Sequence, residues 1–447
     1  MKKIIVLSVL MLLLMGVNSF ATDTRVLTMG ENGTILLDDA NIWLYPSRIN
    51  HYPDILTAEI SSPEYIGPSK AGMAGDQPIS KVGINWKFGG DKPWILGTYL
   101  HNNAQYMDED NMLEMITPSP DIVPYHGPRW DDTEMSFSNK RVDLFWGKMF
   151  GENAFGIHIG YVHSSYKNED LEPNDGITLS ERGFGKYDIS LGLTMMENKL
   201  DLAAGIEILT FTYKNTYYSP DTGNYDYYKP EGNNTMFLRG RYFHEYSPTY
   251  TFVPHAEVKM GKYEYSQNDW NVADEAEEMD YSYKYNLTAF ELGVGMHYTP
   301  ATKVLAVIDF GFMYAGMKEE YTNTIYDSDT SYTEMDEEKW TYTMLPYFKV
   351  GLEAEVFSWM DLRLGATSYW TKYSNEETLY NDSLTTTYTE KYPYNHTYLG
   401  LGFHWNRLHV DTYVDPELFL DGFYFLSGTD SKVAGMNFQI SAKYDMF

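Results

Sequence analysis

The sequence of 447 residues has no cysteine, no long apolar run and little positive charge. Without cysteine the chain forms no disulfide bond and carries no lipid on an N-terminal cysteine. Its longest apolar run, from Ile4 to Met15, is shorter than the roughly 18 residues that a membrane-spanning helix needs. Lysine and arginine number 33 against 63 acidic residues, a formal net charge of −30, which argues against nucleic acid as a partner.

The first residues predict export from the cytoplasm. Lys2 and Lys3 precede the apolar run, and Ser19-Phe20-Ala21 has the small residues of a signal peptidase site. We therefore expect a signal peptide over residues 1–21. No proline- or serine-rich linker divides the remaining sequence, which predicts one large architecture rather than several domains.

Aromatic residues are abundant: 40 Tyr, 22 Phe and 10 Trp make up 16% of the chain. The mean hydropathy is nevertheless only −0.42. A membrane β-barrel combines these two properties, because only alternate residues of each strand touch lipid while Tyr and Trp collect at the membrane interfaces.

Apolar and polar residues alternate with a period of two along most of the chain. In residues 287–316, LTAFELGVGMHYTPATKVLAVIDFGFMYAG, the apolar side opposes Glu291, Gly293 and His297, and the pattern resumes after Pro300. Such alternation predicts strands with one polar face. The same pattern occurs in residues 81–88, 155–161, 187–195, 348–356 and 399–405.

The connections between these strands are alternately short and long, as in an outer-membrane barrel. Counting strands between them gives 15 from Ile79 to Met446. Because an even number is expected, we add a first strand at Asp54 to Ile60 and predict 16 strands, with 14 as the alternative. The short connections are 89–93, 150–153, 197–199, 247–249, 299–302, 357–359 and 406–407; the long ones are about 102–136, 165–186, 214–234, 263–285, 318–339, 373–396 and 415–432.

These observations predict an all-β protein, a transmembrane antiparallel β-barrel in the bacterial outer membrane. We expect residues 22–53 to form an N-terminal periplasmic or plug segment and residues 54–447 to form the barrel. Outer-membrane lipid and the barrel-insertion machinery are then the expected partners, and no cofactor is expected.

The polar face of the strands predicts which side chains line the lumen. Five histidines lie on this face near the short turns. The lumen-lining candidates are His158, Arg239, Arg241, His255, Glu257, Glu291, His297, Glu353, Arg363, His404 and His409.

Four interpretations of this set remain open. Ion pairs that brace the wall and hold an internal plug are favoured. A polar conduit for solutes is the second, and a metal site at His404 and His409 is a third. A catalytic site is the least favoured, because the sequence contains no G-x-S-x-G, H-E-x-x-H or phosphate-binding glycine motif. We therefore expect neither an enzyme nor a metal protein.

The long connections carry acidic and tyrosine-rich stretches such as NVADEAEEMD (residues 271–280) and YDSDTSYTEMDEEK (residues 326–339). We interpret them as solvated external loops. Calcium bound between acidic loops and sugars docked on tyrosines are the alternatives, although no EF-hand spacing is present.

Residues 24–49, TRVLTMGENGTILLDDANIWLYPSRI, resemble the opening of FadL-like and PorV-like outer-membrane barrels. The likeness rests on Met29-Gly30, on an Asp pair and on a proline-containing box, here Tyr45-Pro46-Ser47. The resemblance implies a hatch inside the barrel mouth. The residues that it implies for seating this plug are Asp38, Asp39, Asn41 and Pro46.

The C-terminus is also similar to the last hairpin of such barrels. The terminal Phe447 resembles the signal that the barrel-insertion machinery recognises, although Asp445 stands where an aromatic residue is usual. This resemblance implies transport or shuttling of hydrophobic small molecules or secreted proteins. The alternatives are a general porin-like diffusion channel and a non-transport surface protein that uses its acidic, tyrosine-rich loops to hold partners.

Overall fold

The computed structural model describes most of the strands and the N-terminal segment. The predicted signal peptide and Phe447 lie outside the described residues. The described ranges are 23–61, 79–90, 93–102, 140–172, 176–218, 223–230, 232–271, 276–327, 330–379, 384–414 and 438–446.

Three short helical elements precede an array of strands. The helical elements are α2 (Asp23–Thr28), α3 (Asn41–Leu44) and the 3-10 helix η1 (Pro46–His51). The strands are β1 (Ile55–Ser61), β2 (Ile79–Phe88), β3 (Trp94–Asn102), β4 (Lys140–Phe150), β5 (Asn153–Glu172), β6 (Gly176–Met195), β7 (Leu200–Tyr218), β8 (Gly223–Pro230), β9 (Asn234–Tyr242), β10 (His244–Ser247), β11 (Tyr250–Asn271), β12 (Ala276–Ala301), β13 (Val304–Asp327), β14 (Thr330–Phe357), β15 (Met360–Leu379), β16 (Leu384–Trp405), β17 (Leu408–Val414) and β18 (Phe438–Asp445).

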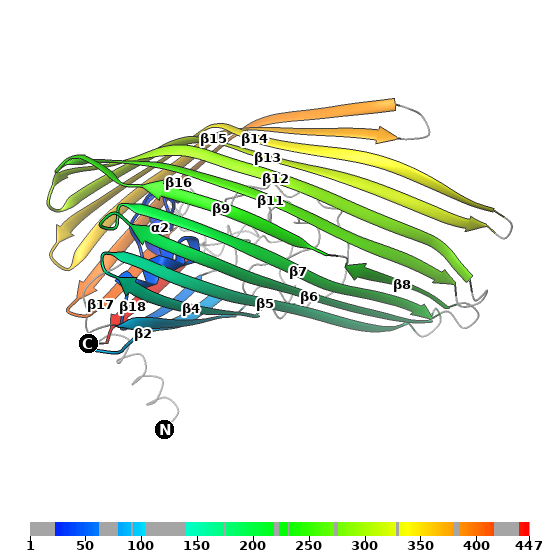
Figure 1. Cartoon of the computed structure of the whole chain (residues 1–447), viewed down its shortest axis with the longest axis horizontal. Helices are drawn as coiled ribbons and strands as arrows, with labels where there is room; N and C mark the ends of the chain where they lie inside the picture. Colours follow the sequence, from blue (N-terminus) through cyan, green and yellow to red (C-terminus); the bar gives the residue numbers. More distant parts are fainter. Residues whose placement is uncertain are drawn as a thin grey trace, which may run out of the picture.

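The strands close into one antiparallel barrel (Figure 1). Every pairing is antiparallel, and β1 closes the ring because it pairs with both β2 and β18. β8 and β9 both lie between β7 and β11, and β10 continues this line along β11, so these three segments form a single wall strand. The wall therefore has 16 strands, as predicted, with β1 as the added first strand.

Several connections predicted as loops are strands instead. Residues 263–271 and 276–285, for example, belong to β11 and β12, and residues 318–327 and 330–339 belong to β13 and β14. The sequence of these parts has polar residues at successive positions, which removes the alternation that identifies a strand in lipid. The short turns, in contrast, fall where the sequence predicts them.

The wall is irregular at one point in β14. On each of the two neighbouring strands, one residue lies opposite both Leu345 and Pro346. The pairing therefore resumes at Tyr347 with a shifted register. This β-bulge exchanges the two faces of the strand: Met344 and Tyr347 both point inward, whereas Leu345 is 59% exposed. Pro254, which also lies inside a strand, pairs with Val294 in regular register.

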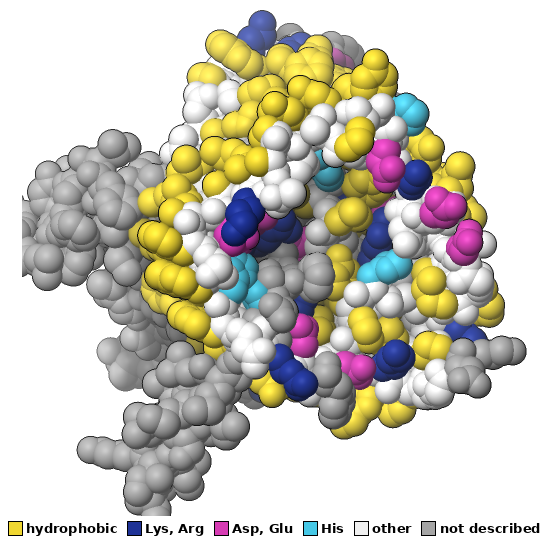
Figure 2. Space-filling model, turned by 90° about the vertical axis from the view of Figure 1, so that its left-hand side faces the viewer, with side chains coloured by type: hydrophobic (Ala, Val, Ile, Leu, Met, Phe, Trp, Pro, Cys, Tyr) yellow, Lys and Arg dark blue, Asp and Glu magenta, His cyan; other side chains and the backbone are white. Residues whose placement is uncertain are grey.

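The outer surface of the wall is apolar, as a lipid-facing surface must be. Leu292, Leu238 and Phe310 are among the exposed large hydrophobic residues, and aromatic rings stack along the short turns, as Phe357 and Trp359 do. Seen from the turn end, hydrophobic side chains cover much of the outside (Figure 2). Within the described ranges no helix is both long and apolar enough to cross a membrane.

The N-terminal segment, residues 23–52, lies inside the barrel near its short-turn end, where α2 is visible behind the front strands (Figure 1). Its apolar residues pack against inward-facing side chains. Ile42 and Ile49 contact a cluster with Tyr99 and Phe145 on one side. On the other side Met29, Ile35 and Leu36 pack with residues that include Val253 and Val307. The core of the molecule at this level is therefore the contact between the segment and the wall.

A lumen site built around the N-terminal segment

Glycines on the inner wall make room for the first part of the segment. Residues 28–30 rest on Gly351 of β14, Gly365 of β15 and Gly400 of β16. A Cβ atom at any of these positions would collide with the segment, and at Gly351 and Gly365 the collision is with its backbone. We call these three glycines the first seat. Because a rigid backbone lies directly above, no side chain fits there.

A second seat holds residues 46–50. It consists of Gly147, Gly156 and Gly192, which pair directly with one another across β4, β5 and β6. A Cβ on Gly156 or Gly192 would overlap the backbone of Pro46 and Ser47. The two seats lie on opposite sides of the strand order, so the segment spans the lumen as a cross-brace.

Buried ion pairs fasten the second part of the segment to the wall. Arg48 donates to both carboxylate oxygens of Asp201 at 2.8 and 2.9 Å, and Arg241 donates to the same carboxylate at 2.8 Å. Asp201 is fully buried, and Thr194 also donates to it. The remaining donors of Arg241 bind the carbonyls of Thr34 and Leu36 and the side chain of Asn41. We call this group the Asp201 clamp.

A corresponding group fastens the first part. Arg25 of α2 donates to both oxygens of Glu353, at 2.7 and 2.9 Å, and to Asp38 at 3.2 Å. Arg363 donates to Glu353 at 2.6 Å and also binds Asp411. Glu353 thus connects the segment to three wall strands. Two arginines around one carboxylate is the arrangement that makes a buried charge tolerable.

The four predicted plug residues are all buried within the segment. Asn41 accepts from the backbone N–H of Asp38 and donates to the carbonyl of Gly33, which holds the turn before α3 together. Asp39 lies 3.1 Å from Lys443 on the wall. Pro46 begins η1 above the second seat. Burial, together with the adjacent Asp39 carboxylate, raises the pKa of Asp38.

Three of the predicted lumen histidines bind separate partners. His158 lies 2.7 Å from Asp143 and stacks on Phe145. His255 lies 3.0 Å from Asp309. His297 donates to the carbonyl of Ile35 in the segment at 3.0 Å. Each histidine therefore belongs to a different part of the wall, and only His297 contacts the segment directly.

His404 and His409 are adjacent. Their Nδ1 atoms are 2.6 Å apart, and Nε2 of His404 lies 2.5 Å from Asp361. No group of three or more candidate ligands arranged to hold a metal ion occurs within the described part of the chain. The pair therefore lies beside Asp361 as part of the hydrogen-bonded wall.

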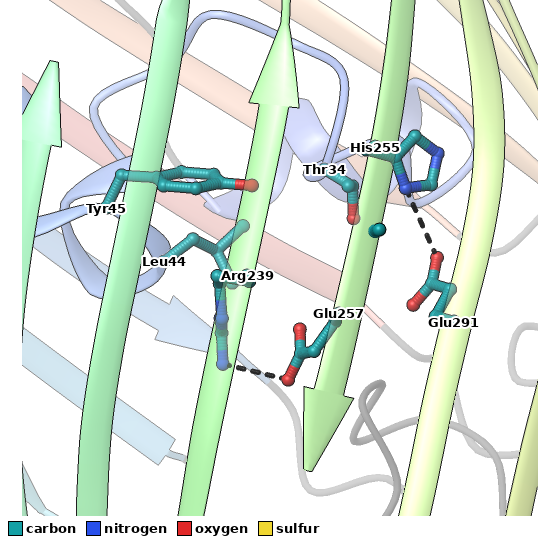
Figure 3. Close-up of a pocket in the computed structure, with 8 residues that line it drawn as sticks. Thr34, Leu44, Tyr45, Arg239, His255, Glu257 and Glu291 are labelled. Atoms are coloured by element: carbon teal, nitrogen blue, oxygen red, sulfur yellow. Dashed lines mark hydrogen bonds and ion pairs between the residues drawn. The ribbon is translucent and has the colours of Figure 1, made fainter.

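A small pocket opens between the segment and β9–β12 (Figure 3). Thr34, Leu44 and Tyr45 line it from the segment. Burial raises the pKa of Tyr45 to about 12, so its hydroxyl keeps its proton and can donate. From the wall come Arg239, His255, Ala256, Glu257 and Glu291.

The charges in this pocket are paired. Arg239 donates to Glu257 at 3.1 Å. His255 faces Glu291 at 3.7 Å as well as Asp309, and Figure 3 shows the first of these contacts together with the Arg239 pair. Arg239 therefore compensates Glu257, whereas Glu291 has a counter-charge here only if His255 is protonated.

Beyond the pocket the inner wall changes character. An apolar inner wall extends across β12 to β15, with Met313, Met344 and Tyr342 each no more than 2% exposed. Tyr347 joins this surface to the pocket, because its ring packs in the cluster while its hydroxyl donates to Glu291 at 2.8 Å. The apolar inner wall consists of Ala289, Met313, Ala315, Tyr342, Met344, Tyr347 and Tyr369.

Sequence reasoning missed the two seats and the partners Arg48 and Asp201. A glycine on the polar face of a strand shows only that a side chain is missing there, not what lies above it. Arg48 was missed because its segment has no periodic pattern that would place it. The available signal is the recurrence of glycine at one level on adjacent strands, as Gly147, Gly156 and Gly192 show. Such a row indicates that another backbone approaches closely.

We predict that Gly365→Val displaces the segment from the first seat. A Cβ at this position meets backbone atoms of Gly30 and Thr28, which cannot yield as a flexible side chain can. Limited trypsin digestion after Arg25 should therefore become faster in the folded variant than in the wild type. Gly90→Ala is the control, because nothing lies within 4 Å of a Cβ there. Equal rates of trypsin cleavage in the two variants would contradict the contact between residues 28–30 and the first seat.

We predict that Asp201→Ala lowers the free energy of unfolding in detergent by about 3–5 kcal/mol, because it leaves Arg48 and Arg241 buried without their counter-charge. Guanidinium titration measures this. Lys303→Ala is the control: it breaks the exposed pair with Glu355 and should cost about 0–1 kcal/mol. A loss at Asp201 no larger than that of the control would refute the Asp201 clamp.

No protein-family model and no curated protein sequence matches this chain. Among solved structures it is similar to the ferric yersiniabactin uptake receptor FyuA of Yersinia pestis, with 10% identity, 88% of this chain and 81% of that chain covered, and a TM-score of 0.35. A mutant ferric enterobactin receptor PfeA of Pseudomonas aeruginosa has 9% identity, 87% and 80% coverage and a TM-score of 0.30. The siderophore receptor PirA of Acinetobacter baumannii has 8% identity, 87% and 80% coverage and a TM-score of 0.30. Such distant likenesses carry no argument about cargo or mechanism.

Proposed function

We propose that this protein is an outer-membrane barrel that transports hydrophobic molecules, in the manner of the FadL-like and PorV-like barrels that its N-terminus resembles. One observation carries the proposal: the apolar inner wall lies on the lumen side of β12 to β15, in addition to the apolar wall residues that contact the segment. A channel for hydrophilic solutes has no use for Met313, Met344 and Tyr342 on its inner face. These side chains are no more than 2% exposed, so a hydrophobic ligand reaches them only when the residues around them move apart.

The N-terminal segment acts as the hatch in this proposal. It crosses the lumen between the two glycine seats, and the Asp201 clamp and Glu353 fasten its two parts to the wall. A general porin needs an open lumen at this level, where the segment crosses from one glycine seat to the other. Transport therefore requires part of the segment to shift, while the buried ion pairs keep it seated when no ligand is bound.

The β-bulge of β14 gives this proposal an exit route. Leu345 and Pro346 interrupt the regular ladder next to Tyr347, which belongs to the apolar inner wall. Proline has no N–H to donate, so the wall lacks one ladder hydrogen bond at Pro346 that another residue could make. A hydrophobic ligand that lies on the inner wall can leave sideways into lipid at this point without crossing water.

We predict that cells producing the protein in their outer membrane take up the hydrophobic dye N-phenylnaphthylamine faster than cells without it, whereas purified protein gives no steady channel openings in planar bilayers. Met344→Glu should abolish the faster uptake, because it places a charge on the apolar inner wall. The control is Met344→Leu, which keeps this position apolar and close to its original volume.

Two outcomes would contradict the proposal. Steady nanosiemens openings of the wild type would identify a porin. Uptake that is unaffected by Met344→Glu, in a variant that still migrates as a folded barrel, would remove the role of the apolar inner wall.

A further inference from the structure

Two lysines on the outer surface of the barrel face each other across β15 and β16. Lys372 and Lys391 are directly paired, and both are exposed, as are the paired residues Trp370 and Pro393 on the same face. Side chains at such positions have their Cβ atoms about 5 Å apart, so their like charges repel. Within the described residues neither lysine has an ion-pair partner. We call these two residues the outer lysine pair.

Another two opposing lysines show how the chain compensates the same repulsion elsewhere on this surface. Lys318 of β13 and Lys339 of β14 are also directly paired. Glu337 bridges them, because one of its oxygens lies 2.7 Å from Nζ of Lys318 and the other lies 2.6 Å from Nζ of Lys339. The described residues supply no such carboxylate to the outer lysine pair.

The outer lysine pair lies where the outer surface changes from apolar to polar. Trp370, the outward residue before Lys372, is 60% exposed, and Leu345 in the bulge of β14 is exposed beside it. From Trp359 at the short turn to Trp370, the chain rises about 25 Å at the usual strand rise and tilt, which is the height of the apolar band of such barrels. Tryptophans at both limits are typical of the two membrane interfaces.

The pair therefore lies at the level of lipid head groups. Short turns of an outer-membrane barrel face the periplasm, so the lysines, at the other end of this band, lie in the outer leaflet. We propose that Lys372 and Lys391 together bind a phosphate group of a phosphorylated glycolipid in that leaflet. The phosphate takes the place that Glu337 has between the other two lysines. This inference concerns the lipid around the barrel and does not depend on the cargo.

The charge of the site selects the kind of phosphate. A phosphate monoester carries nearly two negative charges at pH 7, which compensate two ammonium groups. The phosphodiester of a common phospholipid carries only one. Hydroxyl groups lie next to the lysines on the same face: Ser374 and Thr389 are the following outward pair, with their Oγ atoms 3.1 Å apart. Both can donate hydrogen bonds to phosphate oxygens.

The simpler explanation is that both ammonium groups extend into water, where dissolved salt screens their repulsion. Lysines of that kind attract every anionic lipid alike. A phosphate site instead depends on these two residues and on the monoester, so variants and a comparison of lipids separate the two explanations.

The first test uses the full-length folded protein in the uncharged detergent dodecyl maltoside, titrated with lipid A and observed by native mass spectrometry. Lys372→Gln/Lys391→Gln should weaken lipid A binding about thirtyfold, since each lysine near an anionic lipid surface contributes about fivefold. The matched control is Lys318→Gln/Lys339→Gln, which removes the same two charges from the same surface but from lysines that Glu337 already neutralises. It should leave lipid A binding nearly unchanged. An equal loss in the control would show a general effect of net charge and overturn the proposal.

The second test compares ligands on the wild type. Lipid A should bind at least about tenfold more tightly than dephosphorylated lipid A or phosphatidylglycerol. This preference should disappear in Lys372→Gln/Lys391→Gln, and inorganic phosphate at the same concentration should not displace lipid A. Equal binding of lipid A and either of the other two lipids would refute the monoester site. Displacement by inorganic phosphate would show that the lysines take free phosphate rather than the lipid.

Discussion

The closed ladder of backbone hydrogen bonds is the constraint on which the rest of this structure depends. Because β1 pairs with both β2 and β18, no strand edge faces lipid at this level and every strand presents one side to the membrane. The alternation of side chains then assigns apolar residues to the outside and leaves the inside free to hold glycine or charge. The glycine seats and the Asp201 clamp both use this freedom.

Two kinds of contact hold the segment inside the barrel, the glycine seats and the buried ion pairs. Glycine seats fit the segment closely and resist sliding, whereas ion pairs hold it strongly only while both partners remain buried. Arg48 and Arg241 share one carboxylate, as do Arg25 and Arg363. Each of these carboxylates therefore fastens a different part of the segment to the wall.

Much of the fold follows from the sequence because lipid imposes a strict period of two. The strand number, the first strand near Ile55 and the short turns were all predictable from alternation. The outer parts of β11 to β16 were not, since polar residues at successive positions remove the pattern there. The sequence predicted that Arg239 and Arg241 face the lumen. The partners of Arg241 depend on where residues 23–52 run, and the sequence of that segment has no periodic pattern. The bulge at Leu345 was suggested by Pro346, yet the exchange of faces that it causes depends on the neighbouring strands.

A designed disulfide tests the central claim, the position of the segment across the lumen, most directly. The chain has no cysteine of its own, and the Oγ atoms of Ser47 and Thr194 are 2.8 Å apart. The double variant Ser47→Cys/Thr194→Cys should therefore form an intramolecular disulfide in the folded barrel. A wall pair, Ser374→Cys/Thr389→Cys, whose Oγ atoms are 3.1 Å apart, is the positive control. Cross-linking of both pairs is the predicted result, and cross-linking of the wall pair alone would contradict the account.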